Sequence, residues 1–276
     1  MDFFILGNPR SGTTLLRLIL NAHPKIGVPP ECGMIQWWHE KYKNWGSDDT
    51  QEVDQFKKDI LSSKKIEDWD QRRIQLDNLF TLPLSSYAEV FTKLYQSYTG
   101  KPIVGDKNNY YINHLELIGS IYPTSKYIHL VRDGRDVACS YKGIKELDQS
   151  LKYLPNVPFD IKSIADEWRE NIINVDEFGK RLADNFYTIK YEDILVNPKE
   201  EIEALCDFLE VNFNHHTLEF HRTNDEPKSM LNWKQKTLQP LDEKNFGMFR
   251  NKLSEAEILV FNKIAGNQLK YYGYEA

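Results

Sequence analysis

The most constraining feature of this sequence is a strand, a glycine-containing loop and a helix that follow one another at the start of the chain. Residues 3–6 are a short apolar run that indicates a strand, and residues 13–22 carry leucine and isoleucine at helical spacing. The loop between them contains Gly7 and Gly12. Glycines let backbone N–H groups approach an anion, and the start of a helix attracts negative charge. This arrangement predicts a phosphate-binding loop.

The loop differs at one position from the phosphate-binding loop of ATP-hydrolysing enzymes. That loop has the pattern G-x-x-x-x-G-K-[ST], which Gly7, Gly12 and Thr14 fit, whereas Thr13 occupies the place of the lysine. The lysine normally reaches the β- and γ-phosphates, so its absence argues against ordinary ATP or GTP hydrolysis. Arg10 supplies a cation from within the loop instead. The alternative is a plain strand-to-helix turn that uses glycine only for its geometry.

Further apolar runs indicate strands, separated by helical patterns, at 102–106, 127–131 and 186–190. Strands that alternate with helices imply a mostly parallel sheet between two layers of helices. We therefore predict a P-loop-like, three-layer α/β fold, in which ligands bind beyond the carboxyl ends of the strands. The whole chain, 1–276, is expected to be a single domain with a helical insertion at about 35–98. A polar segment at about 222–248 is a candidate lid over the ligand.

Composition excludes several classes of protein. Lysine and arginine number 35 against 41 aspartates and glutamates, and the net charge of −6 argues against nucleic-acid binding through bulk positive charge. Three cysteines are too few for a disulfide framework, so we expect a reducing, cytoplasmic location. No apolar run approaches the roughly 18 residues of a membrane span. Because a strand is expected from residue 3, we expect no signal peptide.

A second candidate anion site follows the strand at 127–131. Arg132 stands at the carboxyl end of that strand, on the same edge of the sheet as the first loop. A helix that begins near Gly134 places Ser140 in its early turns, where the hydroxyl can turn back toward Arg132. These two groups suit a phosphate, although a solvated loop with an Arg–Asp ion pair is the alternative. Two anion sites without an ATP-type lysine suggest a nucleotide with phosphates at both ends of its ribose.

The paired motifs resemble the sulfotransferases that use 3′-phosphoadenosine 5′-phosphosulfate (PAPS). Residues 9–16 resemble that family's 5′-phosphosulfate loop, and the eight-residue spacing from Arg132 to Ser140 matches its 3′-phosphate motif. Weaker landmarks of the family fall at 105–107, 191–193 and 247–250. The resemblance runs from residue 3 to about 265 and implies a single sulfotransferase domain. Within the family, the chain is most similar to the bacterial branch that resembles tyrosylprotein sulfotransferases.

The resemblance also assigns residues to the donor. It implies that the 5′-phosphosulfate is held by Arg10, Ser11, Gly12, Thr13 and Thr14. Arg132 and Ser140 would hold the 3′-phosphate, and Tyr191 would lie near the adenine. Arg250 is expected on the 3′-phosphate side, although its flanking residues depart from the Arg-Lys-Gly pattern of the cytosolic enzymes.

The implied reaction is in-line transfer of a sulfuryl group from PAPS to an acceptor hydroxyl or amine, which leaves adenosine 3′,5′-bisphosphate (PAP). Arg10 and Lys107 are the candidates for stabilising charge on the transferred group. We expect no metal, because the sequence has no clustered metal-ligand spacing.

An acceptor hydroxyl needs a general base. The cytosolic small-molecule enzymes have a histidine two residues after the lysine, but here that position is Asn109, which cannot take a proton. The tyrosylprotein branch uses a glutamate shortly after the first helix, and Glu31 stands there. We predict Glu31 as the base, with His114 as the second candidate. Otherwise Glu31 is a surface carboxylate in a proline-rich turn.

The acceptor stays open among a glycan, a phenol, a peptide tyrosine and a lipid-linked alcohol, and the sequence indicates no oligomeric state. A cluster of aromatic residues either stacks on the acceptor or packs the inserted helices onto the core: Trp37, Trp38, Tyr42 and Trp45. We interpret the run of Lys64 and Lys65 as a solvated helix face.

Two other functional classes remain open at this point. One is a P-loop kinase or nucleotide-binding switch in which Arg10 replaces the missing lysine; dependence on magnesium and ATP would identify it. The other is a catalytically silent nucleotide-binding scaffold on the same fold. The presence of Arg10, Lys107, Arg132 and Ser140 argues against the scaffold.

Overall fold

The computed structural model describes residues 1–45, 53–79 and 85–275. Within this part of the chain, parallel strands form a five-stranded sheet in the order β2-β3-β1-β4-β5. The strands are β1 (Phe3–Leu6), β2 (Ile26–Gly27), β3 (Ile103–Lys107), β4 (Lys126–Val131) and β5 (Phe186–Lys190). The four predicted strands are confirmed to within a residue, whereas the two-residue β2 at the edge was not predicted.

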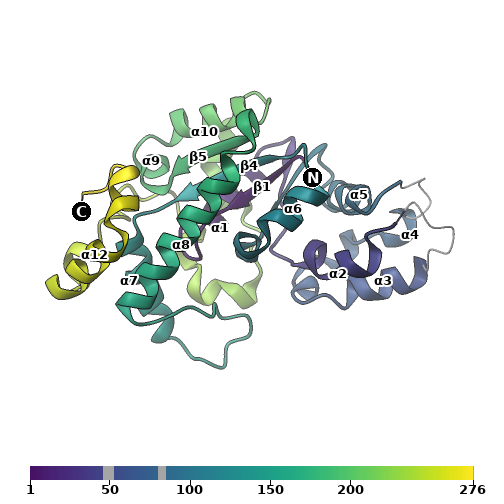
Figure 1. Cartoon of the computed structure of the whole chain (residues 1–276). Helices are drawn as coiled ribbons and strands as arrows, with labels where there is room; N and C mark the ends of the chain where they lie inside the picture. Colours follow the sequence, from purple (N-terminus) through teal and green to yellow (C-terminus); the bar gives the residue numbers. More distant parts are fainter. Residues whose placement is uncertain (46–52, 80–84, 276) are drawn as a thin grey trace.

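Helices connect the strands and cover the sheet (Figure 1). The α-helices are α1 (Thr13–Asn21), α2 (Met34–Tyr42), α3 (Val53–Leu61), α4 (Leu76–Leu79), α5 (Tyr87–Thr99), α6 (Leu115–Ile121), α7 (Gly134–Lys145), α8 (Ile161–Gly179), α9 (Tyr191–Val196), α10 (Pro198–Phe208), α11 (Phe249–Lys252) and α12 (Glu255–Tyr271). Short 3₁₀ helices are η1 (Ile66–Asp68), η2 (Gln71–Arg73), η3 (Asn109–His114), η4 (Ala183–Asn185), η5 (His215–Thr223), η6 (Lys228–Trp233) and η7 (Gln235–Leu238).

Alternation of side chains along the buried strand β1 explains the layering. Phe3 and Ile5 point to one face, where they join a cluster with residues of α1 and α10. Phe4 and Leu6 point to the other face, where they pack with residues of α5 and α6 and with Phe178 of α8. Successive side chains of a strand lie on opposite faces, so a strand that is apolar throughout must be covered on both. The predicted three-layer α/β fold is confirmed.

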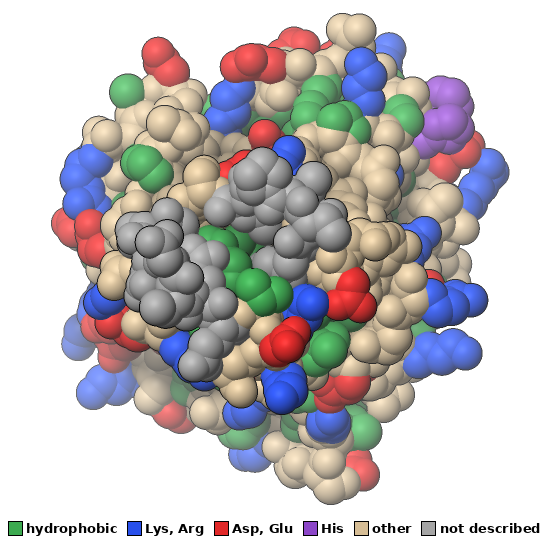
Figure 2. Space-filling view, turned by 90° about the vertical axis from the view of Figure 1, so that its right-hand side faces the viewer, with side chains coloured by type: hydrophobic (Ala, Val, Ile, Leu, Met, Phe, Trp, Pro, Cys, Tyr) green, Lys and Arg blue, Asp and Glu red, His purple; other side chains and the backbone are tan. Residues whose placement is uncertain are grey.

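Residues 34–99 leave the sheet and form α2 to α5, of which α2, α3 and α4 lie at the far right of Figure 1. Residues 46–52 and 80–84 of the predicted insertion lie outside the described part of the chain. Phe56 and Phe91 of these helices share one apolar cluster with Phe4 and Tyr127 of the sheet. Figure 2 shows that acidic and basic side chains are interspersed on the insertion's outer face.

The turn from β1 into α1 depends on the absence of a side chain at Gly12. This residue has φ +99°, and a Cβ atom there would lie 2.5 Å from the Tyr191 ring. Glycine adopts this left-handed conformation without strain and also leaves room for the aromatic ring. The loop after β1 and the start of α9 after β5 therefore meet at the carboxyl ends of the strands.

Candidate functional site

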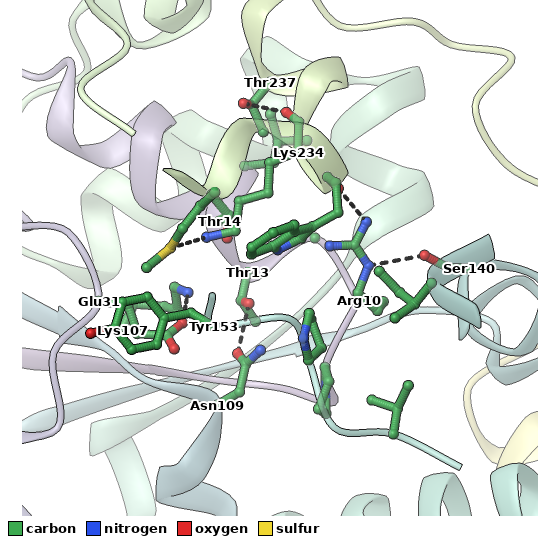
Figure 3. Close-up of a pocket in the computed structure, with 18 of the residues that line it drawn as sticks. Arg10, Thr13, Thr14, Glu31, Lys107, Asn109, Ser140, Tyr153, Lys234 and Thr237 are labelled. Carbon is green, nitrogen blue, oxygen red and sulfur yellow. Dashed lines mark hydrogen bonds and ion pairs between the residues drawn. The ribbon is translucent and has the colours of Figure 1, made fainter. Parts of the chain in front are cut away.

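A cavity of about 1390 Å³ lies at the carboxyl ends of β1, β3, β4 and β5. The segments that follow these strands line it, and so do residues of the chain at 226–245, which we call the covering segment. The covering segment contains η6 and η7 and falls within the predicted lid. Figure 3 shows side chains from the first loop, from β3 and from the covering segment pointing into this cavity.

Arg10 of the first loop makes contacts to two other elements. Its Nε donates a hydrogen bond to the Ser140 hydroxyl at 3.0 Å, and its Nη2 donates to the carbonyl of Trp233 at 2.7 Å. Burial and the nearby Arg132 lower the pKa of Arg10 to about 10. Arg10 therefore remains a cation at neutral pH, in a place where a ligand anion would be favoured over water.

The other loop residues divide into those that line the cavity and one that does not. Gly12, Thr13 and Thr14 line it, and the Thr13 hydroxyl donates to Asn109 Oδ1 at 3.0 Å. Ser11 is not part of the lining: its hydroxyl is buried and has no hydrogen-bond partner among the described residues. The sequence predicted Ser11 as a donor-binding residue, but the structure does not bring its side chain to the cavity.

Arg132 follows β4 as predicted and lies over the Tyr191 ring, with 4.4 Å between the guanidinium carbon and the ring centre. One of its terminal nitrogens donates to the Arg10 carbonyl at 3.2 Å. Its Nε is buried without a hydrogen-bond partner among the described residues. A buried N–H of a cation without a partner costs free energy unless a ligand supplies an acceptor.

Two lysines of the C-terminal part of the chain, Lys236 and Lys252, line the cavity together with Arg132. Burial, followed by the charges of Arg132 and Lys252, lowers the pKa of Lys236. Asp136 and Asp242 oppose these charges; Asp136 Oδ2 is 3.9 Å from Arg132 and Asp136 also accepts hydrogen bonds from the backbone N–H groups of Gly247 and Phe249. These cations form a second basic group in the same cavity as Arg10.

Arg250 lies away from this second basic group. Its side chain is 58% exposed and does not line the cavity, and its Nη2 is 3.8 Å from Glu275. Lys252, two residues further along α11, lines the cavity instead. The sequence predicted a cation at this place in the chain. It did not determine which side of the short α11 faces the cavity, and that side presents Lys252 and not Arg250.

Glu31 is a buried carboxylate that forms ion pairs with two lysines. Lys107, at the end of β3, and Lys65, just before η1, both contact it. Burial favours the protonated form, but the charges of Lys107, Lys65 and Lys234 outweigh burial and hold the pKa of Glu31 far below its usual range. Glu31 is therefore an ionised carboxylate at the cavity wall and not a residue of an exposed turn.

The other candidate base lies elsewhere: His114 is exposed at the end of η3 and does not line the cavity. The interpretation of Lys65 as part of a solvated face is wrong, because its side chain is only 17% exposed and pairs with Glu31. Its neighbour Lys64 is exposed, as expected. Among the aromatic residues, Tyr42 and Trp45 are buried in the core, whereas Trp37 is 40% exposed and lines the cavity with Trp38.

A second set of buried charges, which the sequence did not predict, lies beside the first loop. Lys234 of the covering segment pairs with Glu226, which also accepts a hydrogen bond from Arg17 of α1 at 2.7 Å. Arg17 is fully buried, although the helical pattern of α1 indicates a largely apolar face. The signal that could have found this pair is an arginine within the predicted buried helix, since such a cation needs a carboxylate partner.

In residues 1–45, 53–79 and 85–275, no group of three or more histidine, cysteine, aspartate or glutamate side chains is arranged to hold a metal ion. The helices of the same residues include none that is long and apolar enough to cross a membrane.

Comparison with known proteins places this chain in a family. The family model described as "Sulfotransferase family" matches residues 2–215. The protein-tyrosine sulfotransferase 1 of Danio rerio is 27% identical over 216 residues, which cover 76% of this chain and 53% of that protein. The chain spans 28% of a relative from Aquifex aeolicus and 68% of a putative protein-tyrosine sulfotransferase of Caenorhabditis briggsae.

Solved structures agree with the family match. The sulfotransferase domain of the olefin synthase of Synechococcus PCC 7002 has a TM-score of 0.67 and 25% identity, and the alignment covers 99% of this chain and 94% of that one. A mouse sulfotransferase solved in complex with PAP has the same fold, with a TM-score of 0.53 and 12% identity over 98% of this chain and 84% of that one. Because the family model covers more than half of its residues, the chain belongs to the sulfotransferase family.

Proposed function

We propose that this protein transfers a sulfuryl group from PAPS to an acceptor hydroxyl, or to an amine. One observation carries the proposal: a glycine-containing loop without the ATP-type lysine shares a cavity with a second basic group around Arg132. A nucleotide with phosphates at both ends of its ribose matches two separate anion sites. The mouse sulfotransferase of the same fold was solved in complex with PAP, the product of PAPS, which supports the same donor here.

The side chains present suit such a donor. At the 5′ end, Gly12, Thr13 and Thr14 lie at the start of α1, where N–H groups and the helix dipole favour an anion. At the 3′ end, Arg132 and Ser140 carry over from the family motif, and Lys236 and Lys252 add charge. The unpartnered Arg132 Nε is a donor that a phosphate oxygen would satisfy. The ring of Tyr191, beneath Arg132, offers a flat surface near the adenine.

When bound, PAPS supplies an activated sulfuryl group. Arg10 and Lys107 stabilise negative charge on that group while the acceptor oxygen bonds to sulfur and the bond from sulfur to the 5′-phosphate oxygen breaks. The electron pair of the broken bond stays on the phosphate oxygen. Glu31 accepts the proton that the acceptor hydroxyl loses. The products are a sulfated acceptor and PAP, so atoms and charge balance.

The low pKa of Glu31 bears directly on this role, because a carboxylate with a strongly lowered pKa is a weak base. The positive charges of Lys107 and Lys65 lower the pKa of Glu31. A bound anion would partly neutralise these charges and so weaken their effect on Glu31. The pKa of Glu31 would then rise toward a range that suits proton transfer. Donor binding and activation of the base are thereby coupled through Lys107, which contacts Glu31 and lies in the cavity.

The acceptor would approach past exposed aromatic rings near Glu31. Trp37 is 40% exposed and Tyr110 is 56% exposed, and both line the cavity with Tyr153. The Trp37 ring packs directly on Gly33, where a Cβ would lie 2.5 Å from it, so the ring is held against the backbone two residues after Glu31. The names of the tyrosine-sulfating relatives favour a peptide tyrosine among the acceptors that the sequence leaves open.

The first test is thermal stabilisation by PAP compared with ATP, each with magnesium or with a chelator. Because a ligand that binds only the folded state stabilises it by mass action, a hundredfold excess over Kd adds about 2.7 kcal/mol. We expect PAP to raise the melting temperature without magnesium and Arg132→Ala to reduce this rise. Stabilisation by magnesium-ATP alone would instead identify a kinase or switch.

A second test measures transfer itself, with radiolabelled PAPS and a panel of tyrosine peptides, simple phenols, saccharides and long-chain alcohols. We expect label in at least one acceptor, and loss of that label in Lys107→Met. Binding of PAP without transfer to any acceptor in the panel would favour the silent scaffold.

A further inference from the structure

Lys234 is a buried lysine that lies in the cavity and belongs to neither predicted anion motif. Its side chain is only 9% exposed, and it comes from the turn between η6 and η7. In Figure 3 it points from the covering segment down toward Thr14, at the start of α1. Lys234 thus approaches the first loop from the covering segment, whereas Lys107 comes from β3.

A chain of buried charges holds Lys234 in this position. Its ammonium pairs with Glu226, whose side chain is 1% exposed, and lies 3.4 Å from the Met230 sulfur. Glu226 in turn contacts Arg17, which also donates to the carbonyl of Val28 at 2.9 Å. Three elements thus fix one ammonium group, as expected for a residue whose position matters.

The charges around Lys234 leave the cations in excess. Arg17, Lys65, Lys107 and Lys234 are the cations of this network, and Glu31, Glu226 and the partly exposed Asp225 are its carboxylates. Burial, together with the charge of Lys107, lowers the pKa of Lys234 to about 8, although Glu226 and Glu31 act in the opposite direction. A buried excess of cations is costly unless an anion enters.

We propose that Lys234 is a further catalytic residue, whose ammonium contacts the 5′-phosphate end of the donor from the covering segment. This inference rests on the proposed function. Lys234 neutralises the charge that grows on the 5′-phosphate oxygen as its bond to sulfur breaks, while the acceptor oxygen bonds to sulfur and its proton passes to Glu31. Lys107 from β3 and Lys234 from the covering segment then both contribute positive charge to the reacting group, and the covering segment carries part of the catalytic machinery.

The competing explanation is that Lys234 only neutralises Glu226 inside the protein. Lys234→Met leaves Glu226 with Arg17 alone, so it weakens folding as well as any ligand contact. The double variant Lys234→Met/Glu226→Gln removes both charges and leaves Arg17 paired with Asp225 at 2.9 Å. The matched control is Lys228→Met, an exposed lysine of η6 that does not line the cavity.

The experiment is calorimetric titration of each variant with PAP between about pH 7 and pH 9.5, above the second phosphate pKa of about 6. Loss of one charge-assisted contact weakens binding about 10-fold to 100-fold, and we expect this in Lys234→Met and in the double variant. The Lys228→Met control should bind like wild type. Folding of every variant is checked by its melting temperature.

The pH dependence gives a second, independent readout. Because Lys234 is charged below its pKa of about 8, wild-type affinity for PAP should fall as the pH rises through that value. Lys234→Arg keeps its charge throughout, so its affinity should fall less over the same range. Lys236 also has a lowered pKa, but it is present in both proteins, so the difference between the two curves reports Lys234.

Each outcome has one meaning. If wild type does not bind PAP at all, the proposed function fails. If wild type binds PAP and the double variant binds it equally well, the proposed function stands and the contact from Lys234 is refuted. Identical pH curves for wild type and Lys234→Arg would also refute it.

Discussion

Glu31 shows how a single side chain can serve two purposes at the site. As an anion it keeps Lys107 and Lys65 at the cavity wall, and as a carboxylate it is the proposed proton acceptor. Each of the two lysines that contact Glu31 keeps further N–H donors, so each can also bind a second anion such as the donor. The residue therefore links the charge of the donor to the basicity of the group that acts on the acceptor.

Replacing this carboxylate by its amide separates the two purposes. We expect Glu31→Gln to lower turnover about 10²-fold to 10⁴-fold, because the amide cannot take the proton. Affinity for PAP should stay the same or increase, since the change removes a negative charge beside the anion site. Kinetics with radiolabelled PAPS and calorimetry with PAP measure the two effects. Glu40→Gln, which changes an exposed carboxylate paired with Lys43, is the matched control, and normal turnover in Glu31→Gln would assign the proton to another group.

At this scale, sequence reasoning located groups but not their partners. Motif spacing correctly placed Arg10, Thr13, Arg132 and Tyr191 beside one cavity, because strand ends fix where the next residue lies. The side-chain directions of Ser11 and Arg250 depend on a tight turn and on a short helix, which spacing does not resolve. Burial of Lys65 and Lys234 depends on tertiary packing of charged segments that lack a periodic pattern.

At the scale of elements, the first loop and α9 fit together only because Gly12 has no side chain. A Cβ at Gly12 would collide with the ring of Tyr191. The same ring also packs against the guanidinium of Arg132. A disturbance of this turn therefore reaches the second anion site through the ring. The two motifs, far apart in sequence, form one structural unit.

This contact gives a stability prediction with a matched control. We expect Gly12→Ala to destabilise the fold by about 2–4 kcal/mol, from the left-handed backbone and the collision with the ring. Gly266→Ala, in α12, meets no atom within 4 Å and should instead stabilise by up to about 1 kcal/mol. Urea unfolding curves measure both. Equal stability of the two variants would contradict the proposed role of the turn.

The strands β1, β3, β4 and β5 and the helices α1 and α7 were predicted, since their apolar periodicity or turn signals are strong. The 17-residue α12 was not predicted, and the helices of the insertion were predicted only as one helical segment. The two-residue β2 is defined by its pairing with β3, and the 3₁₀ helices η5, η6 and η7 by their packing over the cavity. Elements of this kind follow from tertiary contacts, so the sequence indicated only a polar segment where the structure has the covering segment.

On the scale of the whole molecule, the inserted helices and the sheet share one apolar cluster. Phe56 and Phe91 of the insertion belong to the same cluster as Phe4, Tyr127 and Phe178. Removal of the insertion would expose to water the part of one face of the central strands that α6 and α8 do not cover. The insertion is therefore expected to unfold with the sheet and not before it.

Two spectroscopic probes can test this coupling. Four of the six tryptophans lie in the insertion, so fluorescence reports chiefly on that part, whereas far-ultraviolet circular dichroism reports on helices throughout the chain. We expect both signals to change at the same urea concentration in a single transition. A fluorescence transition at clearly lower urea would mean that the insertion unfolds independently and that the chain has two cooperative units.

The hydrogen bond from Arg10 to Ser140 joins the two regions assigned to opposite ends of one nucleotide. In the proposed complex, donor binding would separate this pair and replace the internal contact by contacts to phosphate groups. The number of hydrogen bonds then changes little, and the net gain comes from placing a multiply charged anion among cations that otherwise repel one another. Nucleotide affinity should consequently be sensitive to ionic strength, because dissolved ions screen that attraction and weaken the hold of the protein on its ligand.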